Sequence, residues 1–205
     1  MTAQTISPPQ IGPSGTTSLP ETTLEKIRLD LQQWAHYEKA SVRPAFVLRM
    51  VFLTPGFQFV FARRLQELAV RIPVVGRLLR RIIWWASCLA FGSELAIGAE
   101  IGGGLYVPHP FGIVVGCSRL GRRIHLLQNV TLGRRTPDDP RDPEIADDVT
   151  IAAGAVVLGA ITVGAGATIG ANSVVLTDVP PRATAIGAPA RILVRRGPDS
   201  ASAPA

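Results

Sequence analysis

The 205-residue chain is 47% hydrophobic and 18% charged, with a formal net charge of +6. This length accommodates one main domain with a substantial core and a smaller accessory segment. Nucleic-acid binding is not expected, because the arginines that carry the charge sit among aliphatic residues and no recognised nucleic-acid motif accompanies them.

The two cysteines, Cys88 and Cys117, lie far apart and match neither a C-x-x-C pattern nor a zinc spacing. The polar, proline-rich start shows no signal-peptide pattern. We therefore expect a reduced, cytoplasmic setting, either free in the cytoplasm or at the inner face of the membrane.

Both ends of the chain have a composition typical of disorder. Residues 1–21 and 194–205 are rich in Pro, Ser, Thr and Gly and lack an apolar period, so they cannot bury enough surface to offset the entropy of ordering. We expect both segments to be disordered tails.

Residues 22–91 have helical patterning. Thr22 and Glu25 have the spacing of a capping box, and apolar residues then recur at helical intervals, which predicts a helix over 23–39. From 43 to 91 the apolar pattern is interrupted at Pro55 and at Pro73, which predicts three short helices. No uninterrupted apolar run reaches the roughly 20 residues that a membrane-spanning helix needs.

Two functions are consistent with the sequence of this helical segment. Eight arginines lie between Arg43 and Arg81 against one acid, Glu67. The helices can pack on one another and on a partner subunit. Alternatively, residues 77–91 lie in a membrane interface, with arginines toward anionic headgroups and tryptophans at the boundary, giving peripheral association through residues 43–91.

A six-residue period begins after residue 92. The aliphatic positions that share it, with a one-residue slip after Ile113, are Leu95, Ile101, Val107, Ile113, Leu120, Leu126, Leu132, Ile145, Ile151, Val157, Val163, Ile169 and Val175. Six residues suit neither a helix nor a plain alternating strand, and this period is typical of a parallel β-helix whose aliphatic side chains stack from coil to coil. We therefore predict a mainly β fold, with a β-helix over 92–193 after an α-helical segment. Residues 133–144 are polar and proline-rich and break the six-residue period. They predict a loop that projects from the coil, and functional residues often lie on such loops.

Among the three histidines, His109 is the strongest candidate for chemistry. It is the second residue after Val107, at a corner of the predicted coil, where imidazole can act as a general base on a hydroxyl. A histidine that merely bonds to nearby carbonyls is the alternative. His36 lies in the first helix and His125 lies in a later coil, so a three-histidine zinc site does not assemble and no metal is expected.

The run "GIVVG" after a histidine, then "LLQNVTLG", a variable loop and a last coil ending in "GAPARIL" resemble the serine O-acetyltransferases of the hexapeptide-repeat superfamily. The resemblance covers about residues 92–193. It implies left-handed coils, a homotrimer with active sites between subunits, which can pair into a dimer of trimers, and acetyl-CoA in the groove between neighbouring coil stacks.

The resemblance also assigns roles to residues. His109 falls on the catalytic base, and Glu94 stands where the family has an aspartate that orients that base. Pro108 replaces an aspartate involved in recognising the amino acid. In the loop, Arg141 keeps the family's substrate-binding arginine, and Asp142 replaces a histidine that also binds substrate.

For acetyl-CoA, small residues at coil corners would let the backbone reach the pantetheine amides. The residues expected to contact it are Ala153 and Ala171 at corners, Gly133 and Arg134 near the thioester and phosphates, and Arg191 near the adenine end. A backbone N–H near Gly133 or Arg134 would meet the oxyanion.

Three functions follow as hypotheses. The first is acetyl-CoA-dependent acetylation of L-serine for cysteine biosynthesis, since Arg141 can pair with a carboxylate and Glu94 or Asp142 with an ammonium group. The second is acetylation of a sugar hydroxyl in exopolysaccharide production, because the pocket is altered at residues 108 and 142. The third is a non-catalytic trimeric scaffold.

Overall fold

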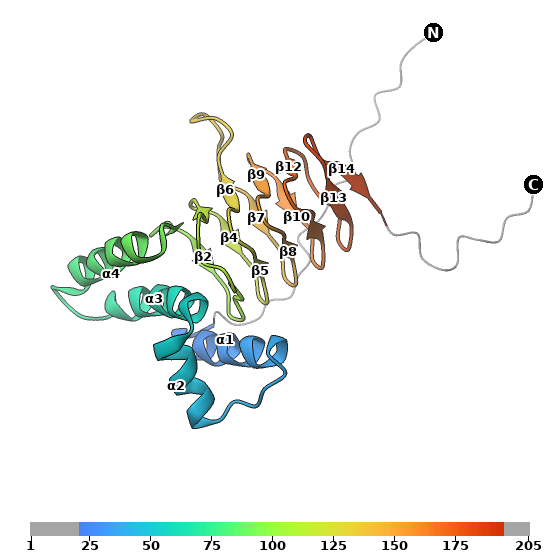
Figure 1. The fold of residues 1–205 in the computed structure, drawn as a ribbon. Helices are drawn as coiled ribbons and strands as arrows, with labels where there is room; N and C mark the ends of the chain where they lie inside the picture. Colours follow the sequence, from blue (N-terminus) through green and yellow to red (C-terminus); the bar gives the residue numbers. More distant parts are fainter. Residues whose placement is uncertain (1–20, 195–205) are drawn as a thin grey trace, which may run out of the picture.

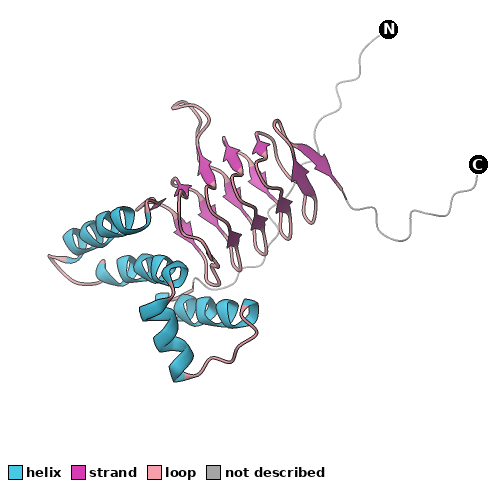
Figure 2. Cartoon of the chain, in the orientation of Figure 1, coloured by secondary structure: helices cyan, strands magenta, loops and turns pink. Residues whose placement is uncertain are grey.

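A computed structural model describes residues 21–194 of the chain. The predicted tails at 1–21 and 194–205 lie outside this range apart from residues 21 and 194. Four helices come first, and short strands wind into a stack of coils after them (Figures 1 and 2). The predicted order of a helical segment and then a β-helix is confirmed.

The helices begin where the sequence signals place them, and the first ends at Tyr37, two residues before the predicted end. Thr22 caps the first helix, because Glu25 N donates to Thr22 Oγ1 at 3.2 Å and Thr22 N donates to Glu25 Oε2 at 2.7 Å. Pro44 and Pro55 each occupy the first helical position, where a missing N–H costs nothing. The four helices are α1 (Thr23–Tyr37), α2 (Pro44–Leu53), α3 (Pro55–Ala69) and α4 (Gly76–Phe91).

The strands form three sheets, each contributing one side of a triangular coil. Sheet A consists of β1 (Glu94–Leu95), β3 (Val114–Val115), β6 (Thr131–Gly133), β9 (Val156–Leu158) and β12 (Val174–Val175). Sheet B consists of β2 (Glu100–Ile101), β4 (Arg119–Leu120), β7 (Glu144–Ile145) and β10 (Thr162–Val163). Sheet C consists of β5 (His125–Leu126), β8 (Thr150–Ile151), β11 (Thr168–Ile169), β13 (Thr184–Ile186) and β14 (Arg191–Leu193). All pairs are parallel except β13 with β14, which closes the stack.

The predicted aliphatic positions are all buried in the centre of the coils. One assignment of the register is wrong. Leu95 pairs with Val115, so Val115 occupies the inward position, and the buried Ile113 lies two residues before it. The corner between Val107 and Val115 is therefore two residues longer than the six-residue period, and the step from Val115 to Leu120 is one residue shorter. The extra residues fall at His109.

The helices cover the open end of the coil stack. The first coil of a parallel β-helix has no preceding coil, so its outer backbone groups need other partners. Asp30 on α1 accepts from Gly104 N at 2.8 Å and Leu105 N at 2.9 Å. Arg64 on α3 donates to the carbonyls of Ile101 at 3.0 Å and of Gly102 at 2.6 Å.

Asp30 and Arg64 also pair with each other. Arg64 Nε lies 2.8 Å from Asp30 Oδ2, and the side chains are 0% and 1% exposed, respectively. Burial alone would lower the pKa of Arg64, but the attraction and hydrogen bonds of Asp30, together with those of Glu67, outweigh it and raise the pKa above its ordinary value. The pair is therefore a buried, charged junction between two helices and the first coil.

Further side chains complete this cap. Trp34 Nε1 donates to Leu105 O at 3.1 Å, and Arg63 Nη1 donates to Ala96 O at 3.2 Å. Arg80 on α4 donates to the carbonyl of Ile97. Arg63 is only 3% exposed, and this burial lowers the pKa of its guanidinium to about 10.

Within residues 21–194, no single helix is both long and apolar enough to cross a membrane. Helices α2 and α3 together have the length and hydropathy of a membrane-spanning segment, but the chain bends by 89° between them.

The buried junction predicts a large loss of stability when one partner is removed. We expect Arg64→Met to lower the free energy of unfolding by about 3–5 kcal/mol, because it leaves the Asp30 carboxylate buried without its counter-charge. The double variant Asp30→Asn/Arg64→Met should lose less than Arg64→Met alone, since the uncompensated charge is then absent. Urea unfolding of both variants measures the difference.

The matched control is Arg49→Met, because the ion pair of Arg49 with Glu38 lies at the surface. This control should change the free energy of unfolding by less than about 1 kcal/mol. Equal small losses for Arg49→Met and Arg64→Met would contradict the role of the junction.

Candidate functional site

His109 lies on the edge of the prism where sheet C passes into sheet A. The corners along this edge, here called the His109 edge, are residues 108–112, 127–130, 152–155 and 170–173. Each corner has one residue in the left-handed conformation: Gly112, Asn129, Gly154 and Asn172. The corners of successive coils are therefore aligned one above the next.

Glycine and asparagine alternate along this edge for a steric reason. A Cβ on Gly112 would lie 2.1 Å from Asn129 Oδ1, and a Cβ on Gly154 would lie 2.1 Å from Asn172 Oδ1. The side chain of Asn129 thus occupies the space beside Gly112, and the side chain of Asn172 occupies the space beside Gly154. A larger residue at either position would have to displace the asparagine side chain and adopt a left-handed backbone, which glycine adopts without strain.

The backbone around His109 is held on both sides. Ser93 Oγ donates to Pro110 O at 2.9 Å and accepts from Ile113 N at 2.9 Å. Before the histidine, Gly56 in the first turn of α3 packs so closely that an added Cβ would lie 2.1 Å from Val107 O. The corner is fixed while the His109 side chain itself is exposed.

Glu94, the expected orienting group, begins β1 in sheet A and is half-buried. Within residues 21–194, no side-chain hydrogen bond joins Glu94 to His109. Pro108 is half-buried beside the histidine. The role given to Glu94 by the resemblance therefore stays a prediction.

Arg141 and Asp142 lie in the loop between β6 and β7, at the other edge of sheet A. Arg141 Nη1 donates to Ile161 O at 3.2 Å, and Arg141 Nη2 donates to Thr162 Oγ1 at 3.3 Å. Arg141 Nη1 also lies 3.6 Å from Glu144 Oε1. The arginine is thereby directed across sheet B.

Asp142 is buried, with 9% exposed, and its Oδ2 lies 3.5 Å from Arg134 Nε. Its other oxygen lies beside Gly116, where an added Cβ would come within 2.7 Å. Arg141 and Asp142 line a cavity of about 330 Å³ whose other walls are Glu100, Cys117, Arg119 and Glu144. This cavity is polar and charged, as a site for a small polar acceptor would be.

The residues expected to bind acetyl-CoA divide between the two edges. Ala153 and Ala171 lie on the His109 edge, and within the described residues their backbone N–H groups make no hydrogen bond. At a coil spacing of about 4.8 Å, they stand roughly 10 Å and 14 Å along the edge from His109. Gly133 ends β6 at the loop edge, Arg134 follows it, and Arg191 is exposed on β14.

The other two histidines lie away from the His109 edge. His125 is on the outer face of sheet C, where its ring lies 5.0 Å from that of Tyr37 and 4.9 Å from that of Tyr106. Burial lowers its pKa below the ordinary value of 6.5. His36 is exposed on α1. Across residues 21–194, no group of three or more His, Cys, Asp or Glu side chains could hold a metal ion.

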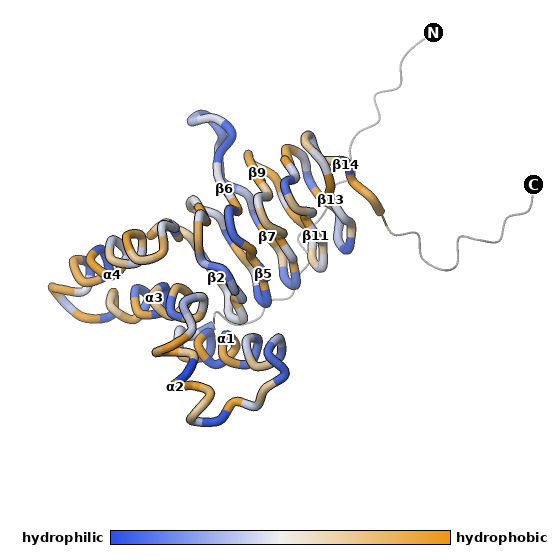
Figure 3. Tube along the Cα trace, in the orientation of Figure 1, coloured by the Kyte–Doolittle hydropathy of each residue, from blue (hydrophilic) through white to orange (hydrophobic). Residues whose placement is uncertain are grey.

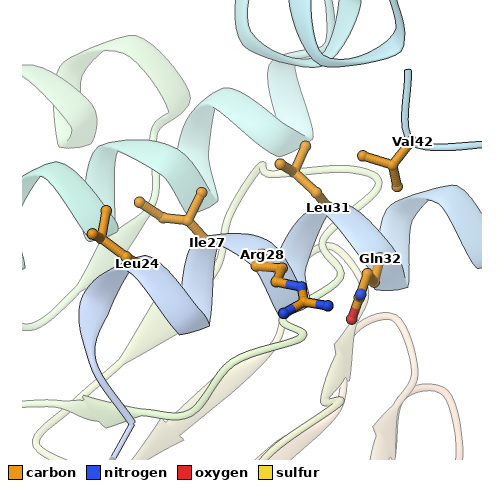
Figure 4. A pocket seen from close by; sticks show the side chains of 6 residues that line it. All are labelled: Leu24, Ile27, Arg28, Leu31, Gln32 and Val42. Carbon is orange, nitrogen blue, oxygen red and sulfur yellow. The ribbon is translucent and has the colours of Figure 1, made fainter. Parts of the chain in front are cut away.

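An apolar groove of about 360 Å³ runs along α1, lined by Leu24, Ile27, Arg28, Leu31, Gln32 and Val42. Figure 4 shows its aliphatic side chains together, with the polar ends of Arg28 and Gln32 turned away from them. The groove contains no acid, histidine or nucleophile, so it offers no group for acyl transfer.

Sequence reasoning missed Ser93 and the asparagines that support the His109 edge. Their signal was available in part, since Asn129 and Asn172 fall at the corners of the period, where left-handed residues are needed. Nothing in the sequence joined Ser93 to a carbonyl that lies 17 positions later.

The fold and the aligned corners are those of a hexapeptide-repeat transferase. A family model described as bacterial transferase hexapeptide (six repeats) matches residues 142–177. The class defined by fold and site is therefore the left-handed β-helical acyltransferases, and the predicted fold class is confirmed.

Comparisons with individual proteins narrow the class. The chain is 38% identical over 152 residues to the serine acetyltransferase of Bacillus pumilus, covering 73% of this chain and 69% of the relative. It is 38% identical over 154 residues to that of Synechococcus elongatus, covering 73% of this chain and 62% of the relative. A solved serine acetyltransferase in complex with CoA superimposes with a TM-score of 0.72 at 34% identity, over 83% of this chain and 69% of that one. The chain belongs to the serine acetyltransferase family.

The chain thus spans about two thirds of the length of these relatives, and slightly less for the cyanobacterial one. A solved serine acetyltransferase of Neisseria gonorrhoeae in complex with serine superimposes with a TM-score of 0.70 at 33% identity, over 82% of this chain and 68% of that one.

The steric fit along the His109 edge gives a first prediction. We expect Gly112→Ala to lower the free energy of unfolding by about 3 kcal/mol, because it combines a left-handed alanine with a clash against Asn129. Gly92→Ala is the control: Gly92 is also left-handed, but nothing lies within 4 Å of an added Cβ, so about 1 kcal/mol is expected. Urea unfolding compares them, and equal losses would show that the clash contributes nothing.

The environment of His125 gives a second prediction. Because its pKa is lowered in the folded state, the unfolded chain binds a proton first as the pH falls below about 6.5, and stability is lost in that direction. We expect the free energy of unfolding to fall between neutral pH and pH about 5.5. His125→Phe should reduce this dependence, whereas His36→Gln should leave it intact. An unchanged pH dependence in His125→Phe would rule out His125 as its source.

Proposed function

We propose that the protein is an acetyl-CoA-dependent O-acetyltransferase with L-serine as its acceptor, giving O-acetyl-L-serine for cysteine biosynthesis. The observation that carries the proposal is the His109 edge. An exposed histidine on a fixed backbone shares this edge with the free N–H groups of Ala153 and Ala171. Family membership and the CoA complex of a relative support the same assignment.

In the proposed reaction, His109 removes the proton from the acceptor hydroxyl, and the hydroxyl oxygen attacks the thioester carbonyl carbon of acetyl-CoA. The C–S bond breaks as the C–O bond of the new ester forms. The proton then passes from His109 to the CoA thiolate. Ala153 and Ala171 suit the pantetheine arm, because their small side chains leave backbone donors accessible.

The site requires a second chain in this proposal. The His109 edge and the loop that carries Arg141 and Asp142 lie at opposite edges of sheet A, so one chain does not bring them together. A homotrimer would place the loop edge of one chain against the His109 edge of its neighbour, and Gly133 and Arg134 would then face the thioester. Two such trimers can pair into a dimer of trimers.

Acetylation of a sugar hydroxyl is the second candidate. Pro108 carries no charge, and the carboxylate of Asp142 is engaged by Arg134, so the pocket has fewer free charges for an amino acid than the resemblance leads one to expect. A neutral acceptor held by hydrogen bonds suits this arrangement. The free thiols Cys88 and Cys117 accord with the cytoplasmic setting that we propose for either acceptor.

Release of free CoA thiol from acetyl-CoA tests the function. With L-serine as acceptor, we expect turnover that falls by about 100-fold or more in His109→Ala, because a general base contributes at least this factor. His36→Ala is the control, since that histidine is exposed on α1, away from the His109 edge.

The same assay with neutral sugars separates the two acceptors. Turnover that is insensitive to His109→Ala would overturn the proposed mechanism. Absence of acetyl-CoA binding by the wild-type chain would favour a trimeric scaffold without catalytic activity.

A further inference from the structure

The outer face of α4 exposes a continuous apolar stripe. Leu78, Ile82, Trp85 and Leu89 follow one another at intervals of four, three and four residues, so they share one side of the helix. They are 63%, 50%, 58% and 67% exposed. The opposite side of α4 packs on α3 and includes the buried Gly76 and Ser87.

The stripe continues into the turn before α4. Val74 is 99% exposed, and Ile72 and Val75 are exposed beside it. Figure 3 shows hydrophobic colouring over much of α4 and around the turn that joins it to α3, and this turn lies at the end of the helices away from the coil stack. A single exposed apolar residue needs no explanation, but a connected face of this kind marks an interaction surface.

Positive charge borders the stripe, and negative charge is absent from it. Arg77 and Arg81 are exposed, lie next to Leu78 and Ile82, and make no ion pair within the described residues. No Asp or Glu occurs in the sequence between Glu67 and Glu94. Arg80 differs, because it turns inward to the carbonyl of Ile97 and is part of the cap.

We propose that this face of α4 binds the surface of an anionic membrane, with Leu78, Ile82, Trp85 and Leu89 inserted at the boundary between headgroups and acyl chains. Arg77 and Arg81 would then contact the phosphates, and the indole of Trp85 would lie at the interface, where its apolar ring and N–H are both satisfied.

Charge complementarity favours a membrane over a second copy of the chain. A twofold contact of this face with itself would set Arg77 and Arg81 against the uncharged side chains of a second α4, because no Asp or Glu occurs between Glu67 and Glu94. An anionic lipid surface supplies the missing negative charge over the whole length of the stripe.

The binding face is separate from the proposed acetyl-transfer site. It contains no residue of the His109 edge or of the loop at 134–143. Variants on α4 should therefore keep the acetyl-transfer activity of the wild type, and failure of either proposal leaves the other standing.

Co-sedimentation of the full chain with vesicles tests the proposal. We expect binding to vesicles of one third phosphatidylglycerol and two thirds phosphatidylcholine, weakening at high salt, and little binding to pure phosphatidylcholine. Arg77→Gln/Arg81→Gln should reduce the partition coefficient by on the order of 20-fold, because each arginine near an anionic surface contributes about fivefold. The triple variant Leu78→Ser/Ile82→Ser/Leu89→Ser should abolish binding.

Leu48→Ser/Phe52→Ser on α2 is the matched control, since it removes exposed apolar side chains from another helix. Circular dichroism should show that every variant is folded. Equal loss of binding in this control would overturn the assignment to α4. Absence of binding by the wild type, together with a smaller oligomer for the α4 triple variant in light scattering, would instead make the face an interface between copies.

Discussion

The buried pair between Asp30 and Arg64 is the interaction on which the rest of the structure depends. A coil stack leaves unpaired backbone groups at its first coil, and such an exposed edge would invite association with other strands. Asp30 and Arg64 satisfy four of these groups while neutralising each other. The helical segment is therefore not an appendage, because it supplies the polar groups that allow the coil stack to begin.

This junction also determines where His109 lies. Helix α3 carries Arg64 into the first coil, and its first turn brings Gly56 against the carbonyl of Val107. On the other side of His109, the Ser93 hydroxyl holds the backbone by hydrogen bonds to Pro110 O and from Ile113 N. The corner with two extra residues is thus fixed by contacts from α3 and from Ser93, which precedes β1, so His109 is presented to solvent from a rigid support.

The two parts of the proposed site lie at opposite edges of sheet A within one chain. The His109 edge carries the proposed base and the backbone N–H groups of Ala153 and Ala171, and the loop edge carries Arg141, Asp142 and Arg134. Membership of the serine acetyltransferase family accounts for the shared framework, while Pro108 and Asp142 are the positions at which the proposed acceptor site departs from the resemblance. In the proposed assignment, the reaction type follows from His109, and the acceptor depends on the two altered positions, Pro108 beside the proposed base and Asp142 on the loop edge.

The sequence by itself determined the coils, the four helices and the corner position of His109, because periodicity and capping are local properties of the chain. It misassigned Ile113, since Ile113 and Val115 are both aliphatic and buried, and only the pairing of Val115 with Leu95 distinguishes them. It gave no sign of the Asp30–Arg64 pair, whose members are 34 positions apart and look like surface residues of two helices. The tertiary structure alone decided which corners lie above one another on the same edge of the prism and which helix residues contact them. The sequence period gives the spacing of the corners along the chain, but it does not give the contacts between residues that are far apart in sequence.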